Sequence, residues 1–392
     1  MKVALPIPSF LPALGGAEVG LHNIAMQLVE KGHVPTVITS YKHVKQLKDN
    51  DWKLPYKVLA YPPKALTLRR THPLVGRSLL NIYHRYLQTR YRFDFWHTTF
   101  GYPTGVSVVE FCRKYNIPHL VRCVGEDIQV NHDIGYGMRL DSGVDTDIRY
   151  WLPRADTLIA ITDSVNEEYQ KIGAENVLKI PNGVCVSRFE KHPVPDDLRR
   201  RLGIDSETFL FLAFGRNHPK KNFRQLIEAA QILKSTRKPP FAVVIAGAGV
   251  GNLQFEVEEQ GVSDVVRLYE PAARAASTLV EVPDDNVIDC YKMANAFVMP
   301  SIVETFGIVL IEAMAAGLPV IAANSPGCRD VIENGKFGEI YDGSLDQLVA
   351  KMEGFLDGTI SLEGLSALGQ QHVQQFDWST VVDRYVNLYQ GR

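Results

Sequence analysis

The sequence has few cysteines and no long apolar run, and each absence narrows the class of protein. Its five cysteines are scattered and include no Cys-x-x-Cys pair; they are Cys112, Cys123, Cys185, Cys290 and Cys328. This pattern argues against a disulfide framework and a structural zinc site, and it fits a reducing environment. No uncharged run reaches the roughly 18 residues that a membrane-spanning helix needs. We therefore expect a cytoplasmic protein with no transmembrane helix and no metal site.

Acidic residues are missing from one segment, although the whole chain is close to neutral with a net charge of −2. Residues 52–93 contain nine Lys or Arg and no Asp or Glu. A helix is expected there from about Leu74 to Arg92, with apolar residues on one face. A basic amphipathic segment suggests an anionic surface, such as the inner face of a membrane, or a phosphorylated acceptor. The alternative is a core helix with a solvated basic face. We expect no nucleic-acid partner.

The chain length of 392 residues predicts two domains. Residues 3–8 are predicted to form a strand. Pro6, Pro8 and Pro12 interrupt the apolar region, which argues against a signal peptide. A helix over residues 17–31 and a strand over 34–39 follow. The pattern restarts with a strand at 209–214, a polar loop, a helix at 223–235 and a strand at 241–246. Two Rossmann-like domains are therefore expected. The first spans 1–190 together with a C-terminal helix at 376–392, and the second spans 191–375.

The stretch from Met299 to Ala323 predicts the end of a strand, a loop, a helix and the next strand. The helix is expected from Gly307 to Ala316, because Gly317 occupies a typical C-cap position and Pro319 follows it. Short connections of this kind imply a parallel, doubly wound sheet.

Two carboxylates in this stretch suggest a polar ligand site. Glu304 lies in the loop at the carboxyl end of a strand, where ligands bind in open α/β sheets. Glu312 lies inside an otherwise apolar helix, where a carboxylate is rarely buried without a partner. Free N–H groups over residues 306–309 favour an anion at the helix start. The alternative is one capping glutamate and one surface glutamate.

A second loop at a strand end supplies two cations, Arg216 and Lys221. Two fixed cations and a helix dipole suit a diphosphate that is bound without a metal. Glu312 can then accept hydrogen bonds from ribose hydroxyls, and Glu304 can reach a sugar attached to the diphosphate. A further motif, Asp145-Thr-Asp147, resembles the DxD motif that binds a metal ion in some sugar-transferring enzymes. It has no apolar strand before it, so we expect a helix surface there.

These motifs resemble those of the family-4 glycosyltransferases, which are retaining enzymes of the GT-B fold, and the resemblance covers nearly the whole chain. Its most specific part is the Glu304-x7-Glu312 motif with its flanks from Pro300 to Val320. Four further matches are Gly215-Arg216 with Lys221, the glycine loop at residues 14–18, Ile180-Pro-Asn-Gly-Val184, and the terminal helix at 378–389.

The resemblance implies an α/β protein of the GT-B fold. Two Rossmann-like domains would face a deep cleft, and the C-terminal helix would cross back to the first domain. The implied reaction moves a sugar from a nucleotide-diphosphate sugar, UDP- or GDP-linked, to an acceptor hydroxyl with retention, without cofactor or metal. A lipid-linked or polysaccharide acceptor is the leading expectation, which makes the partners a nucleotide sugar and a glycan or glycolipid. Such an enzyme would be cytoplasmic and peripheral on the inner face of a membrane.

The resemblance also implies roles for individual residues. Arg216 and Lys221 would neutralise the leaving diphosphate, Glu304 would lie near the donor sugar, and Glu312 would bind the ribose. Further donor contacts would come from Gly16, Phe306, Gly307 and Ile308. The acceptor would lie near Asp127, with Glu126 and Arg122 on the same side.

The chain departs from the family pattern in four places. Cys185 stands where an aspartate often follows Asn-Gly-Val. Val124 stands where many relatives have a histidine, and Arg122, Glu126, His97 or His132 could replace it. Asn222 stands where a glycine is common. Residues 270–283 form an insertion where the family contacts the nucleotide base, which leaves the base open.

Two other functions share these features. One is a GT-B nucleotide-sugar 2-epimerase, and the other is a catalytically silent partner subunit of an active transferase.

Overall fold

A computed structural model describes the chain except residues 51, 196, 237–239, 273–280 and 392. Most of the insertion expected at 270–283 therefore lies outside the described residues. The chain divides into two compact units. Of the described residues, unit 1 contains those in 1–182, 281–282 and 378–391, and unit 2 contains those in 183–272 and 283–377. Among the described helices, none combines the length and the apolar character that crossing a bilayer requires.

Unit 1 is built on a parallel sheet of seven strands in the order β3-β2-β1-β4-β5-β6-β7. The strands are β1 (Lys2–Pro6), β2 (Val34–Thr39), β3 (Lys57–Ala60), β4 (Phe95–Thr99), β5 (His119–Arg122), β6 (Thr157–Ala160) and β7 (Val177–Lys179). The central strands are continuous apolar runs, since helices cover both faces of a parallel sheet. In β1, Val3, Ala4 and Leu5 are all fully buried.

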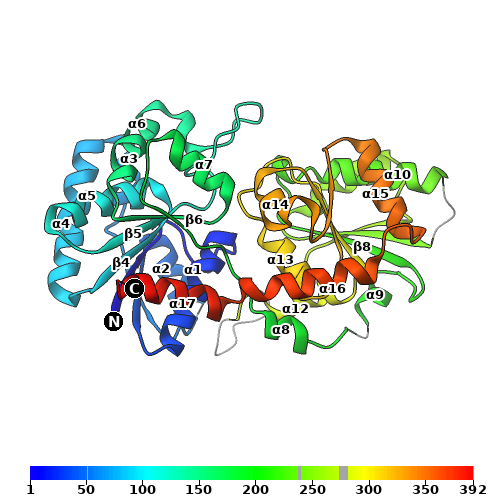
Figure 1. Cartoon of the computed structure of the whole chain (residues 1–392), viewed down its shortest axis with the longest axis horizontal. Coiled ribbons are helices and arrows are strands. Elements are labelled where there is room, and N and C mark those ends of the chain that lie inside the picture. Colours follow the sequence, from blue (N-terminus) through cyan, green and yellow to red (C-terminus); the bar gives the residue numbers. More distant parts are fainter. Residues whose placement is uncertain (51, 196, 237–239, 273–280, 392) are drawn as a thin grey trace. The chain divides into compact units, whose positions relative to one another are not determined.

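The helices of unit 1 pack on both faces of this sheet. They are α1 (Gly16–Glu30), α2 (Tyr41–Asp49), α3 (Ala65–Thr71), α4 (Pro73–Tyr91), α5 (Val106–Tyr115), α6 (Ser142–Trp151), α7 (Asp163–Lys171) and α17 (Trp378–Tyr389). Helices α4 and α5 contact each other on one side of the sheet, while α1 and α17 contact each other on the other (Figure 1). Aromatic side chains attach helix α17 to the rest of unit 1. The hydroxyl of Tyr389 forms a hydrogen bond of 2.6 Å with Nδ1 of His97, and Trp378 is buried.

Unit 2 repeats the architecture with six parallel strands in the order β10-β9-β8-β11-β12-β13. The strands are β8 (Phe209–Phe214), β9 (Phe241–Ala246), β10 (Val266–Tyr269), β11 (Ala296–Met299), β12 (Val320–Ala323) and β13 (Glu339–Tyr341). The helices are α8 (Val186–Lys191), α9 (Leu198–Arg201), α10 (Phe223–Thr236), α11 (Gln254–Glu259), α12 (Asp285–Lys292), α13 (Ile308–Ala315), α14 (Pro326–Val331), α15 (Leu345–Leu356) and α16 (Leu362–Val373). Helices α10 and α15 pack together on one face, and α13 packs with α16 on the other (Figure 1).

The sheet order of unit 2 creates a change of direction between β8 and β11. From β8 the chain proceeds to β9 and β10 on one side, and it then returns to place β11, β12 and β13 on the other. The loops after β8 and β11 therefore leave neighbouring strands toward opposite faces of the sheet. The opening between two such loops, at the carboxyl edge, is where open α/β sheets bind ligands.

The predicted α/β class and the two parallel sheets are confirmed. Strands β2, β8 and β9 have the expected bounds, and the predicted helix at 307–316 is observed one residue shorter at each end as α13. The edge strands β3, β7 and β13 were not predicted. Their side chains are largely half-buried or exposed, so they lack the apolar run that marks a central strand.

Candidate functional site

The loop between β11 and α13 places Glu304 at the carboxyl edge of the second sheet. Pro300 ends the strand, and Gly307 begins the turn into the helix with a φ of +88°. A side chain rarely adopts that left-handed conformation, so glycine is favoured at this position. Phe306 is buried with its ring edge against Phe376. The loop is thus anchored by its apolar member, while Glu304 keeps a slight exposure of 12%.

An ion pair joins this loop to the loop after β8. The Nζ atom of Lys221 donates a hydrogen bond of 2.7 Å to Oε2 of Glu304. Burial opposes ionisation of Glu304, but the charges of Lys221 and Lys220 and hydrogen bonds from Lys221 and the Thr305 backbone hold its pKa below the usual value. The carboxyl group is therefore ionised at neutral pH.

Backbone contacts fix the same loop from two sides. The Ile302 amide donates to the Lys220 carbonyl at 2.8 Å, which links the two loops directly. On the other side, the Gly327 amide donates to the Glu304 carbonyl at 2.9 Å. A Cβ at Gly327 would lie 2.4 Å from the Thr305 carbonyl carbon, so only glycine allows this approach. The position of Glu304 is consequently set by backbone, not only by its ion pair.

Glu312 is buried inside α13, and its partner comes from another helix. The hydroxyl of Tyr291, in α12, donates a hydrogen bond of 2.7 Å to Oε2 of Glu312. Burial raises the pKa of Glu312 to about 7, and the hydrogen bond from Tyr291 opposes this shift only in part. Glu312 is therefore buried and has a protein partner, which contradicts the alternative of a surface glutamate at this position. Tyr291 itself was missed, because no local pattern links positions 291 and 312.

The other expected donor residues lie in a loop after a strand or at the start of a helix. Arg216 follows β8 and is exposed, in the same loop as Lys221. Ile308 is the first residue of α13 and is half-buried. In unit 1, Gly16 begins α1. Asn222 has a φ of +52°, a conformation that asparagine and glycine tolerate better than other residues.

The residues expected on the acceptor side are not equally accessible. Asp127 is fully buried, and its carboxylate accepts hydrogen bonds from the backbone amides of Gly101, Val124 and Gly125. Arg122 is also fully buried and donates to Asn182. Both side chains organise the interior of unit 1, which differs from the expected contact with an acceptor.

Glu126 is exposed. Of the three residues expected on the acceptor side, it alone presents its side chain to solvent. Of the residues considered as replacements for the missing histidine, His97 is fully buried, and its pKa is held well below the usual value by burial and by the charge of Arg122.

The Asp145-Thr-Asp147 motif is occupied by ion pairs, as a helix-surface interpretation predicts. Asp145 pairs with Arg139 and Arg149, each at 2.7 Å, and Asp147 pairs with Arg69 at 2.8 Å. The last pair also shows that not every cation of residues 52–93 lies on the surface, because the Arg69 side chain is only 2% exposed.

Two more arginines of that basic segment pair with acidic residues from elsewhere in the chain. Arg70 pairs with Asp141 at 3.3 Å, and Arg77 pairs with Glu110 at 2.5 Å. These carboxylates lie outside the segment in sequence, so its composition alone overstated its free positive charge.

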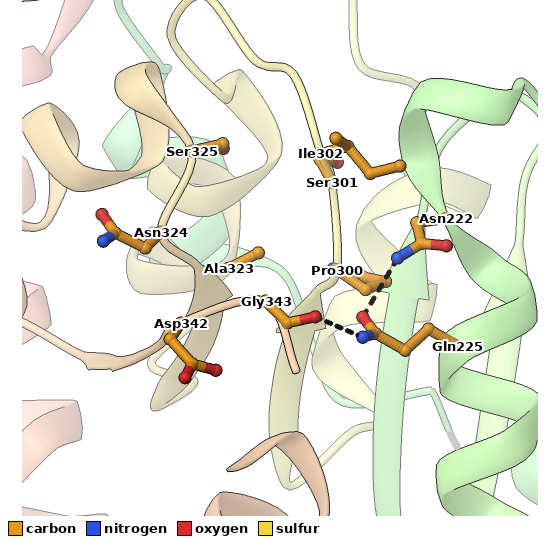
Figure 2. Close-up of a pocket in the computed structure, with 10 residues that line it drawn as sticks. All are labelled: Asn222, Gln225, Pro300, Ser301, Ile302, Ala323, Asn324, Ser325, Asp342 and Gly343. Carbon is orange, nitrogen blue, oxygen red and sulfur yellow. Dashed lines mark hydrogen bonds between the residues drawn. The ribbon is translucent and has the colours of Figure 1, made fainter. Parts of the chain in front are cut away.

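A polar cavity of about 410 Å³ lies at the carboxyl ends of β11, β12 and β13 (Figure 2). Its lining residues are Asn222, Gln225, Pro300, Ser301, Ile302, Ala323, Asn324, Ser325, Asp342 and Gly343. Gln225 joins two sides of the wall, since it accepts a hydrogen bond from Asn222 and donates one to the Gly343 carbonyl (Figure 2). No Lys or Arg is among these residues, so the cavity lacks the cations that a diphosphate needs.

Comparison with known families divides the chain into the same two halves that its sheets define. Residues 14–188 match the model of "Glycosyltransferase Family 4". Residues 195–372 match the model of "Glycosyl transferases group 1". Between them, the two models account for most of the chain.

Two curated relatives of the chain carry different enzyme names. The chain is 31% identical over 249 residues to the D-inositol 3-phosphate glycosyltransferase of Thermobispora bispora, which covers 60% of this chain and 56% of that protein. It is 25% identical over 368 residues to the alpha-monoglucosyldiacylglycerol synthase of Streptococcus pneumoniae, which covers 91% of this chain and 78% of that protein. The first match thus spans little more than half of the relative.

Solved structures share the arrangement of both sheets. Anabaena Alr3699/HepE in complex with UDP superposes with a TM-score of 0.75 at 20% identity over the full length of both chains. WaaG, a glycosyltransferase involved in lipopolysaccharide biosynthesis, superposes with a TM-score of 0.70 at 17% identity, again over both full lengths. These similarities identify the fold as GT-B. With its two family-model matches, its two parallel sheets and the Glu304-x7-Glu312 motif at the carboxyl edge of the second, the chain belongs to the family-4 glycosyltransferases.

Proposed function

We propose that the protein transfers a sugar, with retention and without a metal, from a nucleotide-diphosphate sugar to an acceptor hydroxyl. The observation that carries the proposal is the Lys221–Glu304 pair, which joins two strand-end loops on either side of the change in strand order. It provides a cation where a diphosphate would be held and an ionised carboxylate beside it. A UDP- or GDP-linked donor suits this arrangement, and UDP is the ligand in the Alr3699/HepE structure.

The leaving diphosphate requires positive charge that does not have to move. Arg216 and Lys221 supply side-chain cations, and the backbone amides of Phe306, Gly307 and Ile308 surround the start of α13. Amides at a helix start and fixed cations stabilise charge that develops on a leaving group. Because Lys221 is already paired with Glu304, a bound donor would share this cation with the carboxylate.

The two glutamates divide the donor between them in this proposal. Glu304 would accept hydrogen bonds from hydroxyls of the transferred sugar, and Glu312 would accept them from the ribose. Gly16 of unit 1 would let backbone approach the phosphates. Retention then arises from attack on the same face as the departing diphosphate, assisted by that phosphate, so the chain supplies charge stabilisation instead of a nucleophile.

The acceptor side is the less defined part. We propose that unit 1 binds it, with Glu126 as the exposed candidate for contact, and that Asp127 and Arg122 hold the surrounding loops in place. A glycolipid or glycan acceptor fits the similarity to alpha-monoglucosyldiacylglycerol synthase.

The donor assignment is tested by a thermal-shift panel of UDP-, GDP- and ADP-sugars. A ligand that binds only the folded state at 100 times its Kd adds about 2.7 kcal/mol of stability, so one nucleotide should raise Tm by several degrees. Arg216→Ala should abolish that shift, since its exposed side chain can be removed without damage to the core. Arg224→Ala is the matched control, because Arg224 is exposed nearby and pairs with Glu256 on the surface.

An equal loss of the shift in both variants, or no shift with any nucleotide sugar, contradicts the donor site. Epimerisation of the sugar without any acceptor contradicts the transferase assignment and favours the 2-epimerase.

A further inference from the structure

The outward side of helix α4 exposes large apolar side chains to solvent. Leu74, Val75, Ile82 and Tyr86 are between 57% and 78% exposed. Residues spaced by three, four and seven positions recur on one side of a helix, so these four side chains lie along one stripe. The opposite side carries the helix's contribution to the core; its buried members are Gly76, Leu80, His84 and Leu87. Helix α4 is therefore apolar on two opposite sides, only one of which is covered within its unit.

The exposed stripe extends along most of the helix. From Leu74 to Tyr86 the rise is about 18 Å, at roughly 1.5 Å per residue. Ser78 and Thr89 are the small polar members of the same side, and both are exposed. Scattered exposed apolar residues need no explanation, but a contiguous row of large ones marks a surface that contacts something apolar.

The charge on this side is of one sign. Helix α4 contains no Asp or Glu, and Arg85 and Arg90 are exposed. Arg85 lies 6.0 Å from the ring centre of Tyr115, and Arg90 lies 5.6 Å from that of Tyr91. In the part of the chain that the structure describes, neither guanidinium pairs with a carboxylate, in contrast to Arg69, Arg70 and Arg77. Two exposed arginines of the basic segment, Arg85 and Arg90, thus lie beside the apolar stripe.

We propose that the outward face of α4, defined as Leu74, Val75, Ser78, Ile82, Arg85, Tyr86 and Thr89, lies in the surface of an anionic lipid bilayer. A helix with an apolar row, flanking arginines and no carboxylate lies parallel to the membrane, with its apolar side chains among the upper acyl chains and its cations near anionic headgroups. Tyr86 has the apolar ring and polar hydroxyl that suit this boundary. The face belongs to unit 1 and does not depend on the donor site.

Flotation of the full chain with lipid vesicles tests the proposal. Vesicles of phosphatidylcholine with 30% phosphatidylglycerol should bind the protein at least tenfold more strongly than pure phosphatidylcholine vesicles. Ile82→Glu with Leu74→Glu should lower binding to the anionic vesicles at least tenfold, because it places carboxylates in the apolar row. Arg85→Glu with Arg90→Glu should lower it similarly, and that loss should be matched by added salt in the parent protein.

Two matched controls separate the face from general effects of charge. Phe255→Glu changes an apolar residue of unit 2 that is 71% exposed, and it should leave vesicle binding unchanged. Lys42→Glu with Lys45→Glu reverses two exposed charges on α2 and should have less than a twofold effect. All variants change exposed side chains, and unaltered Tm confirms that they are folded.

Three outcomes overturn the proposal. One is a parent protein that binds neither kind of vesicle, and another is a control that is as damaging as the α4 variants. The third is a parent protein that self-associates in sedimentation and becomes monomeric in Ile82→Glu with Leu74→Glu, which would make the face a protein contact. Loss of vesicle binding with an unchanged nucleotide-sugar shift concerns the membrane face alone, whereas an absent shift with intact vesicle binding concerns the donor site alone.

Discussion

At the scale of single residues, the proposed donor site contains one buried and one almost buried carboxyl group with opposite electrostatic behaviour. The pKa of Glu304 is lowered because Lys221 and Lys220 add positive charge beside it. The pKa of Glu312 is raised to about 7 because burial outweighs the hydrogen bond from Tyr291. At neutral pH one group is therefore an anion, and the other is close to half-protonated.

The raised pKa of Glu312 predicts a pH-dependent loss of stability. Ionisation of Glu312 is harder in the folded state than in the unfolded state. The free energy of unfolding should therefore fall as pH rises from about 4.5 to about 7, and it should be lowest above pH 7. The shift corresponds to roughly 3 kcal/mol. Glu312→Gln keeps an acceptor for Tyr291 and should raise Tm at pH 8 while leaving it nearly unchanged at pH 4.5. An equal change at both values of pH contradicts this account.

The Lys221–Glu304 pair predicts strong coupling between its members. Lys221→Ala leaves an almost buried carboxylate without its main partner and should cost about 3 kcal/mol, the lower end of the range for broken buried pairs. Lys221→Ala with Glu304→Ala should cost less than the sum of the single changes, as urea unfolding would measure. Additive costs would show that the pair contributes nothing as a pair. In transfer assays each single variant should lose activity, since each removes a group proposed to contact the donor.

At the scale of elements, the site depends on how α14 approaches the Glu304 loop. Gly327 is the second residue of this short helix, and a Cβ at this position would meet the backbone of Thr305 and Phe306. The hydrogen bond from the Gly327 amide to the Glu304 carbonyl joins the loop after β12 to the loop after β11. Both loops therefore fix the position of Glu304.

Gly327→Ala should displace the Glu304 loop. The added Cβ meets backbone atoms at 2.4–2.6 Å, which cannot rotate away as a side chain can. Overpacking of this kind costs about 1–3 kcal/mol, and the nucleotide-sugar thermal shift should shrink with it. Gly364→Ala is the control, because its nearest neighbour is the Ser361 hydroxyl at 3.1 Å and little should change. Normal stability and donor binding in Gly327→Ala would remove this role.

The ion pairs of α6 carry a prediction about metals. Asp145 and Asp147 are held by arginines, so neither is available in the way that a metal-binding DxD requires. Transfer should therefore persist in EDTA. Strict dependence on Mg²⁺ or Mn²⁺, restored by adding the ion back, would contradict this prediction.

The sequence predicted elements better than it predicted side-chain partners. Buried strands such as β8 and β9 were found because continuous apolar runs mark them, whereas the edge strands carry too little burial to leave that signal. Within the site, the motif located Glu304 and Glu312, but not the Tyr291 hydroxyl that contacts the second. Arg122 ends β5 and Asp127 follows that strand, as ligand-binding residues often do, yet both side chains are fully buried, and sequence position does not distinguish these cases.

At the scale of the whole molecule, unit 1 is completed by residues that follow unit 2 in the chain. Helix α17 buries Trp378, Val381, Val382, Tyr385 and Tyr389. It packs on α1, and Tyr389 meets the buried ring of His97. Unit 2 draws nothing comparable from beyond Asp377, since its sheet and core come from residues between Gly183 and that point.

Removal of residues from Trp378 onward should destabilise unit 1 selectively. The deletion uncovers the apolar side of α1 and the His97 region, while the strands of unit 2 remain complete. Hydrogen exchange should rise in β1, β4 and β5 and stay unchanged in β8 and β9. An equal rise in both sheets would mean that the two units unfold together.

This dependence on α17 also bears on the order in which the protein folds during synthesis. Unit 1 begins the chain, and N-terminal domains ordinarily fold first as they leave the ribosome. Here the last helix of unit 1 emerges only after all of unit 2, so its sheet must wait with one apolar face incomplete. Unit 2 has no such delay, and the domain translated second is therefore the first that can reach its final packing.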